Sequence, residues 1–147
     1  RLFYIRFMVK IESKKVEIKR NVEFVYEYLA DFTHFSMVAN DKIENFKATQ
    51  DRCSFTIKGM TDMGLKIISR LPNESITISN DTDVPSSMPL NFLIIFEFER
   101  VEPYVTKVIV KMELDANPMI AMMVKKPLEK FVNSLADGMK MAMETMI

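Results

Sequence analysis

The sequence has no net charge: its 147 residues include 20 lysines and arginines and 20 aspartates and glutamates. A domain that binds nucleic acid normally carries a basic excess, because it must neutralise phosphates. A protein that attracts its ligand through a long-range field carries an excess of one sign. The balance therefore argues against nucleic acid as a partner. The closest approach to a basic patch is formed by Lys125, Lys126 and Lys130, which a solvated helix face explains most simply.

The sequence also has a single cysteine and a single histidine. Cys53 has no partner for an intrachain disulfide, which is typical of a reducing compartment, so we expect a cytoplasmic protein. It lies in the alternating segment CSFTIK, where cysteine usually serves as a small buried hydrophobe. Histidine is the side chain that ionises nearest neutral pH. His34 could therefore act as a general base oriented by Asp31, or it is a structural histidine with no catalytic part.

Motifs for phosphate, metal or nucleophile chemistry are missing from the sequence. It contains no glycine-rich phosphate loop, no GxSxG elbow, no HExxH and no CxxC. One histidine and one distant cysteine cannot form a zinc site. Carboxylate pairs such as Asp62 with Glu44, or Asp81 with Asp83, lie in expected loops, where aspartates more often initiate turns than catalyse reactions. We expect no catalytic residue, no metal and no cofactor.

Long apolar runs are absent as well, and no segment approaches the roughly 18 to 20 residues that a membrane-spanning helix needs. Residues 1–7, RLFYIRF, are too short for a signal peptide and lack a small-residue cleavage site. They are either an N-terminal extension or a lengthening of the first strand. The chain length predicts a single domain over residues 1–147.

Alternating patterns typical of β-strands occupy most of the sequence. Residues 8–20 alternate with a slip at Lys14–Lys15, which predicts one long strand with a bulge. Six further alternating segments lie at residues 43–49, 53–58, 65–70, 75–79, 90–100 and 104–114. Residues 80–89 form the clearest loop.

Helical patterns lie between the first and second strands and at the end of the chain. Asn21 predicts an N-cap for a helix that ends near residue 30, and a second short helix follows at residues 32–39. Asn117 and Pro118 begin a helix that reaches about residue 146. Pro127 lies inside it and predicts a kink near Met123, whose carbonyl oxygen would lose its helical partner. One sheet with segregated helices is an α+β architecture.

Three segments carry a resemblance to a known family: VEFVYEYLAD at residues 22–31, SFTIKG at 54–59 and NPMIAMMVKKPLEKFVNSLADGM at 117–139. Together with the element order, they resemble the START-like, or Bet v 1-like, helix-grip superfamily. It includes plant pathogenesis-related proteins, lipid-transfer domains and polyketide cyclases/dehydratases. The resemblance covers about Lys10 to Met143 and implies a curved antiparallel sheet of about six to seven strands around the long C-terminal helix. The segment GMTDMG, residues 59–64, is only a weak echo of the glycine-rich loop of the plant members.

The resemblance further implies a cavity between sheet and helix that holds apolar small molecules. The alternating and helical faces then supply the ligand-binding side chains, unless these simply pack together as a core. They are Phe55, Ile57, Leu65, Ile67, Phe92, Ile94, Phe96, Val108, Val110 and Met112 from the sheet, and Met123, Leu128, Phe131 and Leu135 from the helix.

We therefore expect a non-enzymatic binding or carrier module for a small hydrophobic or amphipathic ligand such as a lipid. One alternative is an enzyme of the polyketide cyclase/dehydratase type that uses the same cavity, with His34 or a pocket acid as proton shuttle. The other is a protein-interaction module or homodimer, whose surface would include the residues Met141, Met143, Met146, Leu93 and Ile95.

Overall fold

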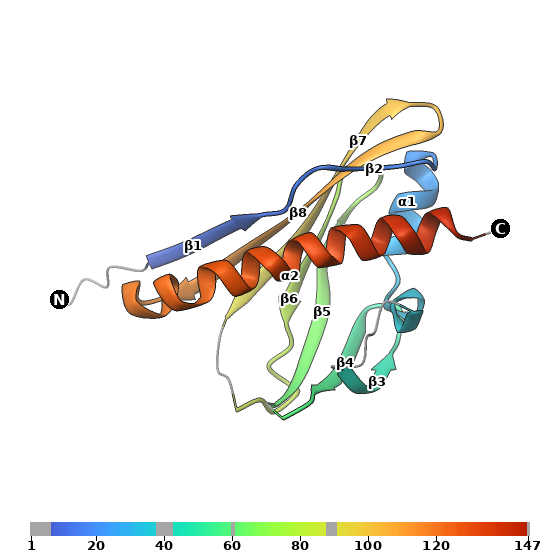
Figure 1. Cartoon of the computed structure of the whole chain (residues 1–147). Coiled ribbons are helices and arrows are strands. Elements are labelled where there is room, and N and C mark those ends of the chain that lie inside the picture. The colour runs from blue at the N-terminus through green and yellow to red at the C-terminus, as the bar shows by residue number, and fades with distance from the viewer. Residues whose placement is uncertain (1–6, 38–42, 60, 88–90, 147) are drawn as a thin grey trace.

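An antiparallel sheet is the scaffold of the structure, a computed structural model that describes residues 7–37, 43–59, 61–87 and 91–146. The described residues form eight strands in the order β1-β8-β7-β6-β5-β4-β3, and β2 also pairs with β8. The sheet curves around the C-terminal helix (Figure 1). The strands are β1 (Phe7–Glu12), β2 (Val16–Ile18), β3 (Ile43–Ala48), β4 (Arg52–Ile57), β5 (Thr61–Leu71), β6 (Ser75–Asn80), β7 (Phe92–Glu102) and β8 (Val105–Ala116).

The predicted long first strand is divided in two at the expected slip. β1 and β2 both pair with β8, and Ser13, Lys14 and Lys15 separate them. Ser13 spans the break because its backbone N–H donates to the Val110 carbonyl at 2.8 Å and its hydroxyl accepts from the Val110 N–H at 2.9 Å. The break therefore removes few hydrogen bonds from the ladder. Because one predicted strand becomes two, the sheet has eight strands rather than the expected six or seven.

The helices begin where the capping residues predict. Asn21 accepts a hydrogen bond from the Phe24 N–H at 2.7 Å and begins α1 (Val22–Leu29). The second short helix is the 3-10 helix η1 (Phe32–Met37), and the rest of its predicted span lies outside the described residues. Asn117 caps α2 (Pro118–Glu144) by accepting from the Ile120 N–H at 2.9 Å.

Helix α2 continues through Pro127 as one uninterrupted α-helix (Figure 1). Pro127 and Met123 are both exposed. The carbonyl oxygen that Pro127 deprives of its helical donor therefore lies on the outward side of α2. It does not face the sheet, so the structure removes the basis for treating it as a polar group inside a ligand site.

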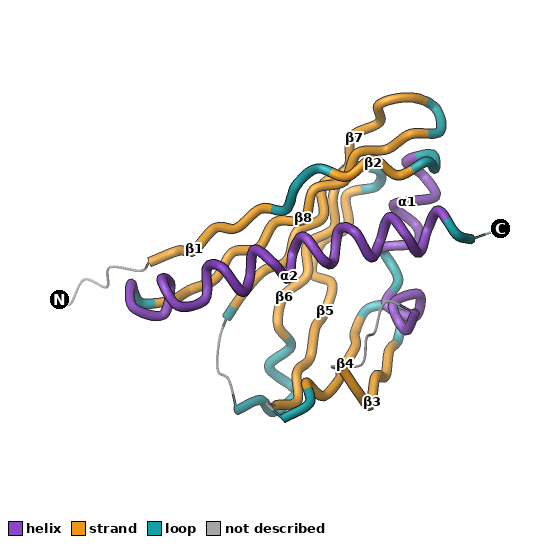
Figure 2. The backbone as a smooth tube through the Cα atoms, viewed as in Figure 1, coloured by secondary structure: helices purple, strands orange, loops and turns teal. Residues whose placement is uncertain are grey.

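The two α-helices cover some strands of the sheet and leave others less covered. Helix α2 packs against β1, β2 and β8, and α1 packs against β6, β7 and β8 (Figure 2). One flank of α2 is bonded to the β1–β2 connection: Asn133 Oδ1 accepts from the Lys14 N–H at 2.8 Å, and Asp137 forms an ion pair with Lys14 at 3.0 Å. Near the C-terminus, Glu144 accepts from the Lys19 N–H at 2.9 Å. These bonds place α2 over one half of the sheet.

Two expectations about local structure are wrong. Residues 61–64 are the start of β5 rather than part of a loop, because the ladder with β4 already begins at the pair Ile57 and Thr61. Met143 is fully buried and belongs to the core, so it cannot contribute to an exposed partner surface. It lies four residues after the buried Met139, on the same face of α2.

Candidate functional site

The predicted sheet residues all project from one face of the sheet, the concave one. In an antiparallel ladder, directly paired residues project from the same face. The register pairs Cys53 with Leu65, Ile67 with Ile78, Ile78 with Ile94, and Ile94 with Met112. Alternation along each strand adds the others. The ten predicted sheet residues therefore share one surface, which α2 faces.

Burial of this concave face falls from β8 toward β4. Six predicted residues on β7 and β8 are buried: Phe92, Ile94, Phe96, Val108, Val110 and Met112. The predicted residues on β4 and β5 are only half-buried, as is their neighbour Met63. We call this set the β4–β5 strip: Phe55, Ile57, Met63, Leu65 and Ile67. It is apolar and incompletely covered because α2 lies over β1, β2 and β8.

Helix α2 presents a matching apolar flank. Val124, Leu128 and Leu135 are half-buried against the core. Phe131 is 44% exposed and by helical spacing lies beside Leu128 and Leu135. We call these four residues the α2 flank. It lies on the opposite side of α2 from Asn133, which is bonded to the β1–β2 connection, so it borders the less covered half of the sheet.

Met123 is not brought together with the other predicted residues. Its side chain is 72% exposed. The buried positions Ala121 and Val132 define the face of α2 that meets the sheet, and Met123 projects from the opposite side. Val124 takes the place predicted for Met123, and Met63 joins the strip. Met63 could have been found from the alternation of β5, had the strand been recognised to begin at Thr61.

No protein-family model and no curated protein sequence matches the chain. Solved structures do match over almost its whole length. A START superfamily protein from Mycobacterium smegmatis has a TM-score of 0.71 at 16% identity, covering 93% of this chain and 97% of that one. The chain has the START-like, Bet v 1-like helix-grip fold.

Two further helix-grip structures show the range of this likeness. Norcoclaurine synthase from Thalictrum flavum, in complex with dopamine and hydroxybenzaldehyde, has a TM-score of 0.70 at 12% identity, covering 97% of this chain and 90% of that one. The protein XoxI from Bacillus cereus has a TM-score of 0.69 at 12% identity, covering 94% and 96%. Identities this low establish the shared fold and leave the function of this chain to its own residues.

Two surface hollows occur among the described residues of this helix-grip domain, and the first of them borders the β4–β5 strip at Ile57. The first, about 580 Å³, is open to solvent and is lined by Thr56, Ile57, Gly59, Thr61, Asp62, Pro85, Ser86 and Ser87. The second, about 240 Å³, is lined by Lys15, Glu97, Phe98, Glu99, Lys107, Val108 and Ile109. No described residue of α2 lines either hollow. A molecule held between strip and flank would therefore rest on a largely open apolar surface.

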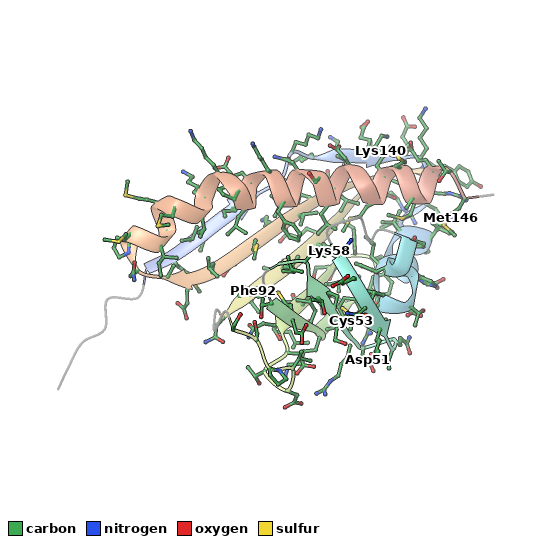
Figure 3. All side chains as sticks on the ribbon, turned by 60° about the horizontal axis from the view of Figure 1, so that its bottom comes forward. Asp51, Cys53, Lys58, Phe92, Lys140 and Met146 are labelled. Carbon is green, nitrogen blue, oxygen red and sulfur yellow. The ribbon has the colours of Figure 1, made fainter. Side chains whose placement is uncertain are left out.

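Two side chains of the helix-grip domain near the concave face, Cys53 and Arg70, are buried or already paired; Cys53 and Asp51, the partner of Arg70, are labelled in Figure 3. Cys53 is buried on β4, and burial raises the pKa of its thiol to about 12, so it stays neutral and unreactive. Arg70 donates to the Ala30 carbonyl at 2.9 Å and forms an ion pair with Asp51 at 2.7 Å. Neither side chain is available for catalysis in this arrangement.

His34 is held by Tyr28 rather than by Asp31. Its Nδ1 lies 2.8 Å from the Tyr28 carbonyl oxygen, and the two rings stack with centroids 4.9 Å apart. Asp31 Oδ1 instead accepts from the hydroxyl and N–H of Thr33, and the hydroxyl bond is the main cause of the lowered pKa of Asp31. The predicted base-and-orienter pair is therefore not formed.

Metal ligands and membrane-spanning helices are also missing from the part of the chain that the structure describes. Within these ranges, no group of three or more His, Cys, Asp or Glu side chains could hold a metal ion. No described helix is long and apolar enough to cross a membrane. What the described site offers to a ligand is apolar contact.

Proposed function

We propose that the chain is a non-enzymatic binding or carrier module for a small hydrophobic or amphipathic molecule, which would lie between the β4–β5 strip and the α2 flank. The observation that carries the proposal is the incomplete burial of two apolar surfaces in one domain, one on the concave face of the sheet and one on the helix that covers part of that sheet. A protein core normally buries such side chains fully. A small apolar molecule would remove the remaining exposed surface from water.

The energetics favour weak, reversible binding. Removing about 300 Å² of apolar surface from water contributes about 7 kcal/mol at roughly 25 cal/mol per Å². Association costs about 4 kcal/mol or more in lost translational and rotational freedom. The difference corresponds to an affinity in the millimolar range, and each further 100 Å² of contact adds about 2.5 kcal/mol. A longer lipid-like ligand would therefore reach micromolar affinity without a charged partner.

Binding is favoured over catalysis by the state of the polar groups. Two described side chains near this face that could exchange a proton or act as a nucleophile are engaged or inert: His34 Nδ1 contacts the Tyr28 carbonyl oxygen, and the buried Cys53 thiol stays neutral. A cyclase-like enzyme needs a positioned group that can exchange a proton with its substrate. The apolar surface needs none, so it supports the carrier proposal more directly.

A neutral fluorescent probe, N-phenyl-1-naphthylamine, tests the proposal. Phe131→Gln should weaken saturable probe binding about tenfold, because it places an amide without a hydrogen-bond partner against the apolar ligand. Met123→Gln is the matched control, since Met123 is a more exposed apolar residue of the same helix, on the side of α2 that faces away from the sheet. The control should bind the probe as the parent protein does.

Two results would contradict the proposal. One is the absence of saturable probe binding by the parent protein, and the other is equal weakening by both substitutions. Thermal unfolding of each variant shows whether a loss of binding is a loss of folding. Native mass spectrometry of the purified protein, followed by identification of any retained small molecule, would identify the natural ligand.

A further inference from the structure

The outward face of the first half of α2 exposes three large apolar side chains in little more than one turn. Met119, Met122 and Met123 are 73%, 84% and 72% exposed. Lys126 and Lys130 are exposed on the same side of the helix, one and two turns further on. We call these five residues the methionine–lysine face. It is separate from the α2 flank, which lies on the side of α2 opposite Asn133.

The lysines of this region differ from other lysines of the protein. Lys111 and Lys140 have carboxylate partners at 2.8 and 2.9 Å. Within the described ranges, no salt bridge involves Lys126 or Lys130. From Pro118 to Ala136 the sequence has one acidic residue, Glu129, which is half-buried. The face is therefore both apolar and positively charged, although the whole chain has no net charge.

We propose that the methionine–lysine face docks on an anionic lipid bilayer, with α2 lying parallel to its surface. Methionine side chains are flexible and can enter the boundary between headgroups and acyl chains. Lysines beside them keep their ammonium groups among anionic headgroups while their stems contact apolar surface. The combination of exposed apolar and basic side chains on one helix face is the pattern of an interfacial helix.

A bilayer fits this face better than a folded protein does. The face is the convex side of a single helix, whose opposite side already packs on the sheet through Ala121 and Val132. The helix that carries the face is therefore already folded and held in place, and it can lie on a membrane surface without a change of structure. The face also ends within the helix: Asp137, the next acidic residue of α2 after Glu129, forms an ion pair with Lys14 of the β1–β2 connection. The basic and apolar character is confined to the first half of α2.

Vesicle co-sedimentation tests the proposal with two compositions, phosphatidylcholine alone and phosphatidylcholine with phosphatidylserine. The parent protein should sediment with the anionic vesicles and much less with the neutral ones. Lys126→Gln/Lys130→Gln should weaken anionic binding by about thirtyfold, the factor expected for removing two lysines from such a surface. Met122→Ser/Met123→Ser should weaken it by about tenfold.

Met141→Ser is the matched control, because Met141 is 69% exposed on α2 beyond the face, and it should bind as the parent does. The proposal is overturned if the parent stays in the supernatant with anionic vesicles. It is also overturned if the lysine variant binds as well as the parent. Sedimentation velocity without lipid gives a third decisive result: a dimer that Met122→Ser/Met123→Ser disperses would make this face an interface between two copies.

Discussion

Gly64 on β5 is a position where one added methyl group should destabilise the protein measurably. Gly64 is buried, and a Cβ built there would lie 2.5 Å from Val84 Cγ2 and 2.7 Å from Val84 Cβ. Ordinary van der Waals contacts are about 1 Å longer. The Asp81 N–H donates to the Gly64 carbonyl at 2.8 Å, and the Val84 N–H donates to the Asp81 carbonyl at 3.2 Å. These bonds hold Val84 over Gly64, so it cannot easily move away.

Two opposing terms set the expected magnitude for Gly64→Ala. Alanine restricts the unfolded chain and contributes about 0.4–1 kcal/mol to stability when the native backbone suits it. Overpacking of a buried position costs about 1–3 kcal/mol. With two contacts below 3 Å, the cost of overpacking should exceed the stabilisation that alanine gains from its restricted unfolded chain. We expect a net loss of about 1–2 kcal/mol, or a fall in the melting temperature of about 3–6 °C.

Urea denaturation followed by far-UV circular dichroism measures this effect, and the midpoint should fall while the slope stays constant. Val84→Gly removes both close atoms, so it supplies a double-mutant cycle. Gly64→Ala should cost much less in the Val84→Gly background than in the parent, because neighbouring residues do not contribute independently. The reasoning would be refuted if Gly64→Ala were as stable as the parent, or if the two effects simply added.

Two further predictions concern ionisable groups. Burial alone would raise the pKa of Glu144, but its bonds with Lys140 and the Lys19 N–H outweigh burial and lower the pKa below the ordinary 4.5. Glu144 thus contributes stability above about pH 4.5 that is lost as the pH falls through its folded pKa. Glu144→Gln should melt lower at pH 7 and lose less on acidification; parallel melting curves would contradict this. Cys53 has a pKa near 12, so about one thiol in 10⁴ is ionised at pH 8. A thiol-reactive dye should label it about a thousandfold more slowly in the folded than in the unfolded protein, and equal rates would contradict its burial.

The local structure was largely determined by the sequence. Asn21 and Asn117 predicted both α-helix starts because their side chains satisfy the free N–H groups of a first turn. Period-two alternation predicted the strands and the residues that share the concave face, because neighbouring side chains on a strand must project to opposite sides. The exception was the start of β5, which begins at Thr61 rather than at the expected Leu65.

The tertiary structure decided how far each apolar face is covered. Periodicity gives a helix an apolar stripe, but the rotation of α2 on the sheet depends on distant bonds such as that between Lys14 and Asn133. That rotation made Phe131 part of the flank and left Met123 exposed on the outward side. The partner of the His34 ring, the Tyr28 carbonyl, lies only six residues away at the junction of α1 and η1, and residue type alone did not indicate it. The local sequence determines which side chains share one face of a helix or strand. How far that face is buried depends on contacts between segments far apart in sequence.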